Sequence, residues 1–332
     1  MTQRTLEIVK EAFSLARPFR ISRGVKHSAH LIRATVREGA FKGEGECCPY
    51  NRYGETIDKV LKTLEDVRQG IEQGLDCTRL QSLLPPGAAR NALDCAFWDL
   101  EAQQTGKPVF ARLGLPQILE FTTFRTVGIT TPEKMGLEAA SYPVGSPLKI
   151  KLGQELVAER LGAIRNAAPE STLMVDANEG WTAEFLADVM PTLKKLGVVL
   201  IEQPLPVKDD EALRSISRTV PILADEACHT LSDLAGLKGK YDAINIKLDK
   251  TGGLTQAKSL MNMAKTGGFK IMLGCMVSSS LSIAPISHLC SDADFIDLDG
   301  PLLLKADPYQ GLIEVKDAAM VKITHPWGRI RV

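Results

Sequence analysis

The stretch 172–202 begins with the apolar run Thr172-Leu-Met-Val-Asp176 and ends with the similar run Val198-Val-Leu-Ile-Glu202. An amphipathic segment lies between the two runs, and each run ends in an acidic residue. Parallel strands are buried on both faces and are joined by helical crossovers, so they read as short apolar runs between amphipathic segments. The stretch therefore predicts one strand–helix unit of an α/β fold.

This unit repeats along the chain from about residue 120. The sequence contains eight such apolar runs: Phe121–Ile129, Leu148–Leu152, Thr172–Asp176, Val198–Glu202, Ile222–Asp225, Ala243–Leu248, Lys270–Cys275 and Phe295–Leu298. Eight units fit a closed (β/α)8 barrel of ordinary size. An open doubly wound sheet is the competing fold, but the glycine-rich phosphate turn that would follow its first strand is missing from the sequence.

The first third of the chain has a different pattern. Arg4–Phe13 and Ala29–Arg37 alternate like strands, the basic segment Arg17–Lys26 between them reads as a loop, and residues 55–113 have helical spacing. Three glycines are predicted to form turns: Gly39, Gly43 and Gly45. We expect an α+β domain in residues 1–115 and the barrel in 116–302. The tail, 303–332, is expected to return to the first domain.

Composition excludes several classes of protein. Lys plus Arg and Asp plus Glu both number 40, so no basic surplus points to nucleic acid or to an anionic membrane. No apolar run reaches the roughly 18 residues of a membrane span, and Met1–Glu11 lacks the apolar core of a signal peptide. Seven cysteines without a Cys-x-x-Cys pair favour free thiols over disulfides or zinc. We expect a cytoplasmic protein and leave a homo-oligomer open.

Charged residues stand at the ends of the apolar runs. Six of them recur once per unit or pair of units: Lys151, Asp176, Glu202, Asp225, Lys247 and Asp297. The C-terminal ends of parallel barrel strands meet at one mouth, where catalytic groups of such barrels lie. A single acid after a strand can simply cap the next helix. Six charged groups in register favour an active site instead.

Asp176, Glu202 and Asp225 belong to three consecutive predicted strands. Carboxylate oxygens without histidine or cysteine form a hard ligand set, which suits Mg²⁺ and also accommodates Mn²⁺. Three unpaired carboxylates would repel one another, so a cation is expected among them. The sequence therefore predicts one divalent metal ion at the mouth of the barrel.

Two lysines flank the predicted metal site. Lys151 ends the second strand and Lys247 the sixth, so in an eight-stranded ring they face each other across the mouth. One can remove a proton from a carbon and the other can return one to the opposite face. Lys149 shares a face with Lys151, and crowding of positive charge is expected to lower a lysine pKa toward that of a general base. A solvated strand edge is the alternative for Lys149.

These residues fall into a set of short motifs: Lys149-Ile-Lys151, Asp176-Ala-Asn178, Glu202-Gln-Pro204, Asp225-Glu226 and Asn245-Ile-Lys247. In this order they resemble the muconate-lactonizing branch of the enolase superfamily, and the resemblance extends to the N-terminal region around residues 87–100. It implies a (β/α)7β TIM-type barrel with an α+β capping domain that both chain termini build.

Within that branch the chain resembles the dipeptide epimerases, and above all those of the L-Ala-D/L-Glu type. The supporting segments are 49–55, 245–253 and 297–301. The resemblance implies an Mg²⁺-dependent isomerase of murein peptide metabolism, in which Lys151 and Lys247 invert the α-carbon of the C-terminal residue by 1,1-proton transfer through an enediolate. It also implies that Asp297 and Asp299 bind the dipeptide's ammonium group, although Asp299-Gly300 also reads as a plain turn.

Further substrate contacts are less well specified by the sequence. Arg23, with Arg17 and Arg20 nearby, is the expected partner of a distal substrate carboxylate, unless the basic loop is merely solvated. Cys275 ends the seventh predicted strand and Thr126 lies on the first; both are expected to touch substrate, with a packed side chain as the alternative for each.

Other functions stay open at this point. An N-acylamino acid racemase, a cycloisomerase or an o-succinylbenzoate synthase would use the same metal and lysines. The Asp-x-Asp pair argues against them because it suits an amine-bearing substrate. A barrel that binds a ligand without catalysis would not need the full set of lysines and acids.

Overall fold

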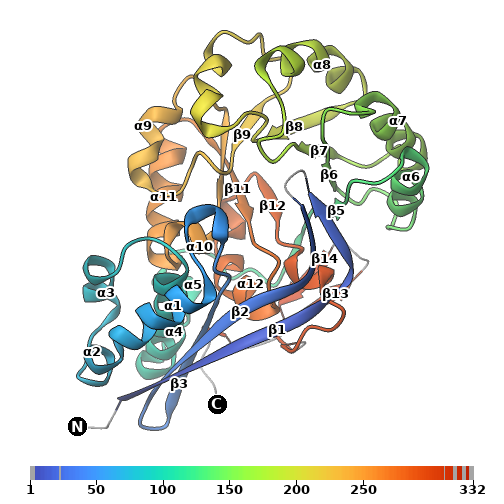
Figure 1. The fold of residues 1–332 in the computed structure, drawn as a ribbon. Helices are drawn as coiled ribbons and strands as arrows, with labels where there is room; N and C mark the ends of the chain where they lie inside the picture. The colour runs from blue at the N-terminus through green and yellow to red at the C-terminus, as the bar shows by residue number, and fades with distance from the viewer. Residues whose placement is uncertain (1–3, 22–23, 310, 317–319, 324–326, 329–332) are drawn as a thin grey trace.

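The computed structural model describes residues 4–21, 24–309, 311–316, 320–323 and 327–328. Figure 1 shows a ring of parallel strands surrounded by helices, with a separate antiparallel sheet and helix cluster packed at its open end. None of the helices in the described ranges combines the length and the apolar character that a bilayer crossing requires. All seven cysteines are free thiols.

The described barrel strands form one parallel sheet. Their order is β12-β11-β10-β9-β8-β7-β6-β5, so the strands follow one another around the ring. Their bounds are β5 (Arg125–Val127), β6 (Leu148–Lys151), β7 (Leu173–Asp176), β8 (Val198–Glu202), β9 (Ile222–Ala224), β10 (Ala243–Ile246), β11 (Lys270–Gly274) and β12 (Phe295–Asp297). Phe124 N donates to Ile296 O at 2.9 Å and joins the last strand to the first. The predicted barrel is confirmed.

Helices cover the outside of this ring and connect its strands. Their bounds are α6 (Pro132–Ala140), α7 (Val157–Ala167), α8 (Ala183–Lys195), the 3-10 helix η2 (Val207–Arg214), α9 (Leu234–Leu237), α10 (Leu248–Thr251), α11 (Leu254–Thr266) and α12 (Ser280–Ser287). Hydroxyl side chains cap several of them, as when Thr131 accepts from Lys134 N and Thr182 accepts from Phe185 N.

The interior of the barrel explains where the charged groups point. Its floor is a buried apolar cluster that includes Met174, Leu200, Leu223 and Met272. Alternate residues of a strand share a face, so the residue two positions after each floor residue faces the same interior. Asp176, Glu202 and Asp225 follow Met174, Leu200 and Leu223 at this spacing.

The first apolar run was predicted to be one barrel strand, and this is wrong. It divides into β4 (Glu120–Thr122) and β5, and β4 pairs with β14 (Met320–Ile323) in an antiparallel sheet that also contains β13 (Ile313–Lys316). Phe121 is buried between two exposed neighbours. This alternation is typical of a strand with one buried face, unlike the fully buried strands of a parallel barrel.

The capping region consists of a three-stranded sheet and five helices. Their bounds are β1 (Arg4–Ile21), β2 (Gly24–Glu38), β3 (Phe41–Cys47), α1 (Ile57–Asp66), α2 (Arg68–Glu72), α3 (Cys77–Leu83), α4 (Ala88–Thr105) and α5 (Val109–Arg112). The loop predicted over 17–26 is wrong, because β1 and β2 continue through most of it. Pro18 is tolerated there because the pairing shifts register between Ser14 and Phe19.

Two of the three glycines predicted as turns have another role. Gly43 and Gly45 lie within β3, where an added Cβ would stand 1.9 Å from Ala96 O and 2.1 Å from Ala92 O, respectively. Both carbonyls belong to α4, so glycine at these positions lets the sheet lie directly on that helix. The turn prediction is wrong for both, whereas Gly39 has the positive φ of a turn.

The tail of the chain contacts the capping region. Trp327 Nε1 donates to Glu44 O at 2.7 Å, and Gly328 N donates to Asp99 Oδ1 at 2.9 Å. The tail therefore reaches the first domain at Trp327 and Gly328, whereas the bounds 1–115, 116–302 and 303–332 stay a prediction. Buried acids tie the cap to the barrel: Cys48 N donates to Asp249 Oδ1 at 2.9 Å, and Ser279 N donates to Glu46 at 3.0 Å.

Candidate active site

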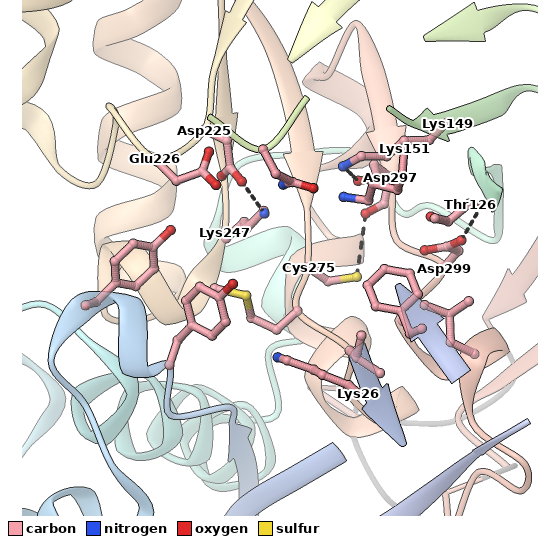
Figure 2. Close-up of a pocket in the computed structure, with 18 residues that line it drawn as sticks. Lys26, Thr126, Lys149, Lys151, Asp225, Glu226, Lys247, Cys275, Asp297 and Asp299 are labelled. Atoms are coloured by element: carbon pink, nitrogen blue, oxygen red, sulfur yellow. Dashed lines mark hydrogen bonds and ion pairs between the residues drawn. The ribbon is translucent and has the colours of Figure 1, made fainter. Parts of the chain in front are cut away.

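A cavity lies at the C-terminal ends of the barrel strands, directly under the cap (Figure 2). Its empty volume is about 650 Å³, part of which is open to solvent. Eight residues predicted from the sequence line it: Thr126, Lys149, Lys151, Asp225, Lys247, Cys275, Asp297 and Asp299. Arg23, also predicted, lies outside the described residues.

The two remaining predicted residues, Asp176 and Glu202, lie at the base of this group. Both side chains are almost completely buried, and across β6, β7 and β8 the residues Lys151, Asp176 and Glu202 are direct strand partners. Strand register therefore brings together side chains that are far apart in the sequence.

Four acids at the mouth pair with lysines. Lys151 Nζ is 2.5 Å from Asp176 Oδ2, and Lys247 Nζ is 2.6 Å from Asp225 Oδ2. Lys149 Nζ is 2.6 Å from both Glu202 Oε2 and Asp297 Oδ2. Figure 2 shows Lys151 and Lys247 on opposite sides of the cavity, as expected for strands four apart in the ring.

These pairs control the protonation of the site. Burial alone would lower the pKa of Lys149 and Lys247, but the adjacent carboxylates raise both well above the usual value. The expectation that crowding lowers the lysine pKa is therefore wrong for this arrangement. Burial alone would raise the pKa of Asp176 and Asp225, but their lysine partners bring the pKa of both acids below the ordinary value.

Glu202 is the acid with the least compensation. Burial, together with the negative charge of Asp176, raises its pKa to about 8 despite the nearby ammonium of Lys149. Among the described residues, no three histidine, cysteine, aspartate or glutamate side chains already form a metal-binding cluster, since lysines hold the acids. The donors are all oxygens on neighbouring strand ends, and the raised pKa of Glu202 shows that Lys149 does not fully compensate its negative charge. They fit a hard divalent cation.

Residues that the sequence analysis missed hold these acids in place. Asn245 Nδ2 donates to Glu202 Oε1 at 2.9 Å. Lys250 Nζ donates to Asp225 Oδ1 at 2.6 Å and to two backbone carbonyls. Lys250 lies three residues after Lys247, inside segment 245–253, but the sequence assigned it no role.

The acidic pair after β12 forms the other side of the cavity. Asp297 Oδ1 is buried and accepts no hydrogen bond from any residue that the structure describes. Asp299 Oδ2 accepts from Thr126 N at 2.8 Å, and burial with the charge of Asp297 raises the Asp299 pKa to about 6. β12 ends at Asp297 rather than running through Asp299, yet both side chains line the cavity.

The cap also lines the cavity, with four side chains that were not predicted: Phe19, Lys26, Tyr50 and Tyr53. Lys26 Nζ lies 4.8 Å from the centre of the Tyr50 ring, and the Tyr53 ring packs edge-on against His229 at 4.3 Å. Arg17 points elsewhere, because its guanidinium pairs with Glu138 at 3.2 Å.

Two family models match this chain. Residues 3–114 match the N-terminal domain of mandelate racemase / muconate lactonizing enzyme, and residues 143–320 match the model described as Enolase C-terminal domain-like. The protein belongs to the mandelate racemase / muconate lactonizing enzyme family of the enolase superfamily. The resemblance predicted from the sequence motifs is thus confirmed, together with the capped barrel that it implied.

Curated members of this family include two similar proteins with different names. The L-Ala-D/L-Glu epimerase of Escherichia coli K12 is 45% identical, over 92% of this chain and 95% of its own length. The N-acetyl-D-glutamate racemase of a Pseudoalteromonas species is 46% identical, over 83% of this chain and 88% of its own.

Solved structures of family members have the same fold. An Agrobacterium tumefaciens protein with homology to dipeptide epimerases, with bound sodium and L-Ala-L-Glu, superimposes with a TM-score of 0.93 at 43% identity and covers 97% of this chain and 98% of its own. The Cytophaga hutchinsonii dipeptide epimerase, complexed with Mg and D-Ala-L-Val, has a TM-score of 0.89 at 27% identity over 97% and 94% of the two chains.

Proposed function

We propose that this protein is an Mg²⁺-dependent dipeptide epimerase that inverts the α-carbon of the C-terminal residue of an Ala-Glu-like dipeptide. The observation that carries the proposal is a single cavity with a lysine on each side, three acids at its base and a further acidic pair beside them. The epimerase names of similar family members support the same chemistry.

The two lysines divide the work between the faces of the substrate carbon. One takes the α-proton as an amine, and the other donates a proton as an ammonium from the opposite face, which inverts the centre. In the observed arrangement both ammonium groups pair with acids. Catalysis therefore needs one of these contacts to loosen, so that a neutral amine is available.

Asp176, Glu202 and Asp225 are the residues that would hold the metal. When bound there, Mg²⁺ supplies positive charge beside the substrate carboxylate and stabilises the negative charge that develops as the α-proton leaves. Asp297 and Asp299 would bind the substrate's ammonium group, because a buried carboxylate with an unused oxygen is a suitable partner for a cation.

The overall test uses the intact protein with Mg²⁺ and a mixture of dipeptides in D₂O. We expect deuterium to enter the α-position of the C-terminal residue, with the formation of the opposite epimer. Ala-Glu epimers are the expected best substrates. We propose that they reach the enzyme in the cytoplasm as peptides derived from murein. The absence of exchange on every dipeptide would exclude the proposed function.

Removal of the metal is expected to stop the reaction. Activity should fall by at least about 10²-fold after treatment with EDTA, since metal charge stabilisation contributes several kcal/mol. Mg²⁺ or Mn²⁺ should restore it. Calorimetric titration of the EDTA-treated protein should show one metal site, and Asp225→Asn should weaken it. Full turnover in excess EDTA would contradict the metal assignment.

Lys26 is proposed as a partner of the substrate's distal carboxylate in addition to Arg23, which lies outside the described residues. Lys26 is the described cationic side chain of the cap that lines the cavity. Lys26→Met is expected to lower kcat/KM for Ala-Glu by about 10- to 100-fold, because a hydrogen bond to a charged group contributes about 1.5–3 kcal/mol. Turnover of Ala-Leu should change little. Lys10→Met, at an exposed position of β1, is the matched control. Equal losses for both dipeptides would contradict this role.

An N-acylamino acid racemase is the second candidate function. The 46% identity to an N-acetyl-D-glutamate racemase specifically favours it. This enzyme would use the same lysines and metal, but its substrate has no free ammonium group to pair with Asp297 and Asp299. The acidic pair therefore distinguishes the two functions.

A further inference from the structure

Glu179 connects three segments at the edge of the cavity. Its carboxylate accepts two hydrogen bonds from the Arg52 guanidinium, from Nη2 at 2.7 Å and from Nε at 3.0 Å, and a third from Val207 N at 3.2 Å. Arg52 belongs to the cap, Glu179 follows β7, and Val207 follows β8. The ion pair therefore joins the cap to the two loops that come directly after Asp176 and Glu202.

The backbone at Glu179 is held in an unfavourable conformation. Its φ is +63° and that of Asn178 is +46°, the left-handed region that side chains with a Cβ rarely adopt. Hydrogen bonds fix this turn, because Glu179 N donates to Gln203 O at 2.8 Å and Asn178 N donates to Asp176 Oδ1 at 2.9 Å. Strain of this kind persists where the surrounding structure determines the conformation, often at functional sites.

Arg52 lies in the short 3-10 helix η1 (Asn51–Tyr53), which carries the aromatic wall of the cavity. Tyr50 occupies the N-cap position of this helix and Tyr53 is its last residue. Their rings pack edge to face with centroids 5.2 Å apart. The Lys26 ammonium rests on Tyr50. A displacement of η1 would therefore move Tyr50 and take away the support of Lys26.

We propose that Arg52 and Glu179 are positioning residues for substrate selectivity, which fix η1 so that Tyr50 holds Lys26 where the distal carboxylate of an acidic dipeptide binds. This inference rests on the proposed function and adds a determinant outside the cavity itself. Neither residue lines the cavity among the described residues, so both act through Tyr50.

The second described ion pair between cap and barrel at this end has a different character. Arg17 and Glu138 make a single contact at 3.2 Å, and the Arg17 side chain is 72% exposed. The Arg52 side chain is 43% exposed and that of Glu179 is 8% exposed, and Arg52 binds both oxygens of the Glu179 carboxylate. Exposed single pairs contribute little, whereas bidentate pairs on a buried carboxylate fix geometry. Arg17 is therefore a suitable control for Arg52.

The test uses three variants, namely Arg52→Met, Glu179→Gln and the double variant that combines these two changes. Arg17→Met is the control. For each protein, kcat and KM are measured with Ala-Glu and with Ala-Leu. We expect the first two variants to raise KM for Ala-Glu about tenfold, with smaller changes in kcat, because ground-state binding is what they lose. Ala-Leu should change less than about threefold. The double variant should lose no more than either single variant, since both remove one interaction. Arg17→Met should resemble the wild type.

A purely structural role would lower turnover of both dipeptides equally, and this result, or additive losses in the double variant, would overturn the proposal. Hydrogen–deuterium exchange of residues 49–55 provides a readout that is independent of activity. We expect faster exchange there in Arg52→Met than in Arg17→Met, and unchanged exchange would also overturn the proposal. If the wild type exchanges the α-proton of no dipeptide, the proposed function fails. The amide exchange of residues 49–55 still decides whether the Arg52–Glu179 pair fixes η1.

Discussion

Epimerisation is expected to fall by about 10²- to 10⁴-fold when either Lys151 or Lys247 is replaced by methionine, the usual contribution of a positioned general acid or base. Each lysine reaches one face of the substrate carbon, so inversion needs both. Each variant should keep exchange of the α-proton with D₂O for one substrate epimer only, and the two variants should prefer opposite epimers. Nuclear magnetic resonance of each pure epimer in D₂O measures this directly.

The interpretation of these variants requires a control for the buried charges. Loss of Lys151 removes the ammonium 2.5 Å from Asp176, and loss of Lys247 removes the one 2.6 Å from Asp225. An unpaired buried charge destabilises a protein, so Tm and metal affinity are measured beside turnover with saturating Mg²⁺. A variant that epimerises at nearly the wild-type rate would rule out the two-lysine mechanism. Loss of exchange for both epimers in a folded, metal-binding variant would show that the replaced lysine is needed for proton removal from both epimers, which contradicts one lysine per face.

Acetylation of the substrate is expected to have the second large effect. Asp297 and Asp299 are each 4% exposed, and N-acetyl-Ala-Glu lacks the ammonium group that would pair with them. Loss of one partner of a buried charge pair costs about 2–5 kcal/mol, which is roughly 30- to 5,000-fold in kcat/KM. Free Ala-Glu should therefore be the better substrate by such a factor. Asp297→Asn should narrow the difference by impairing mainly the free dipeptide.

The same experiment separates the two candidate functions when N-acetylglutamate is added as a third substrate. A dipeptide epimerase should turn it over poorly. Faster turnover of N-acetylglutamate than of Ala-Glu would assign the chain to the racemase type of its Pseudoalteromonas relative. The metal and lysine assignments would stand in either case, because both reactions remove an α-proton next to a carboxylate.

The sequence by itself determined the barrel, the family and the charged groups at its mouth. Lys151, Asp176, Glu202 and Asp225 could be identified because each ends an apolar run. Strand periodicity fixes which face a residue occupies, and parallel topology brings all strand ends to one edge. These rules are local and regular, so they can be read without coordinates.

Only the tertiary structure decided how the cap completes the site. No periodic pattern places Lys26 in the cavity wall, or separates β4 from β5 within one apolar run. The bidentate contact joins Arg52 and Glu179, which are 127 positions apart, and it depends on how two regions dock. The pairing of lysines with acids, which raises the Lys149 pKa against expectation, also depends on distances that the sequence does not encode locally. Packing between segments without repeats has no sequence signature, because its partners are set by the whole fold.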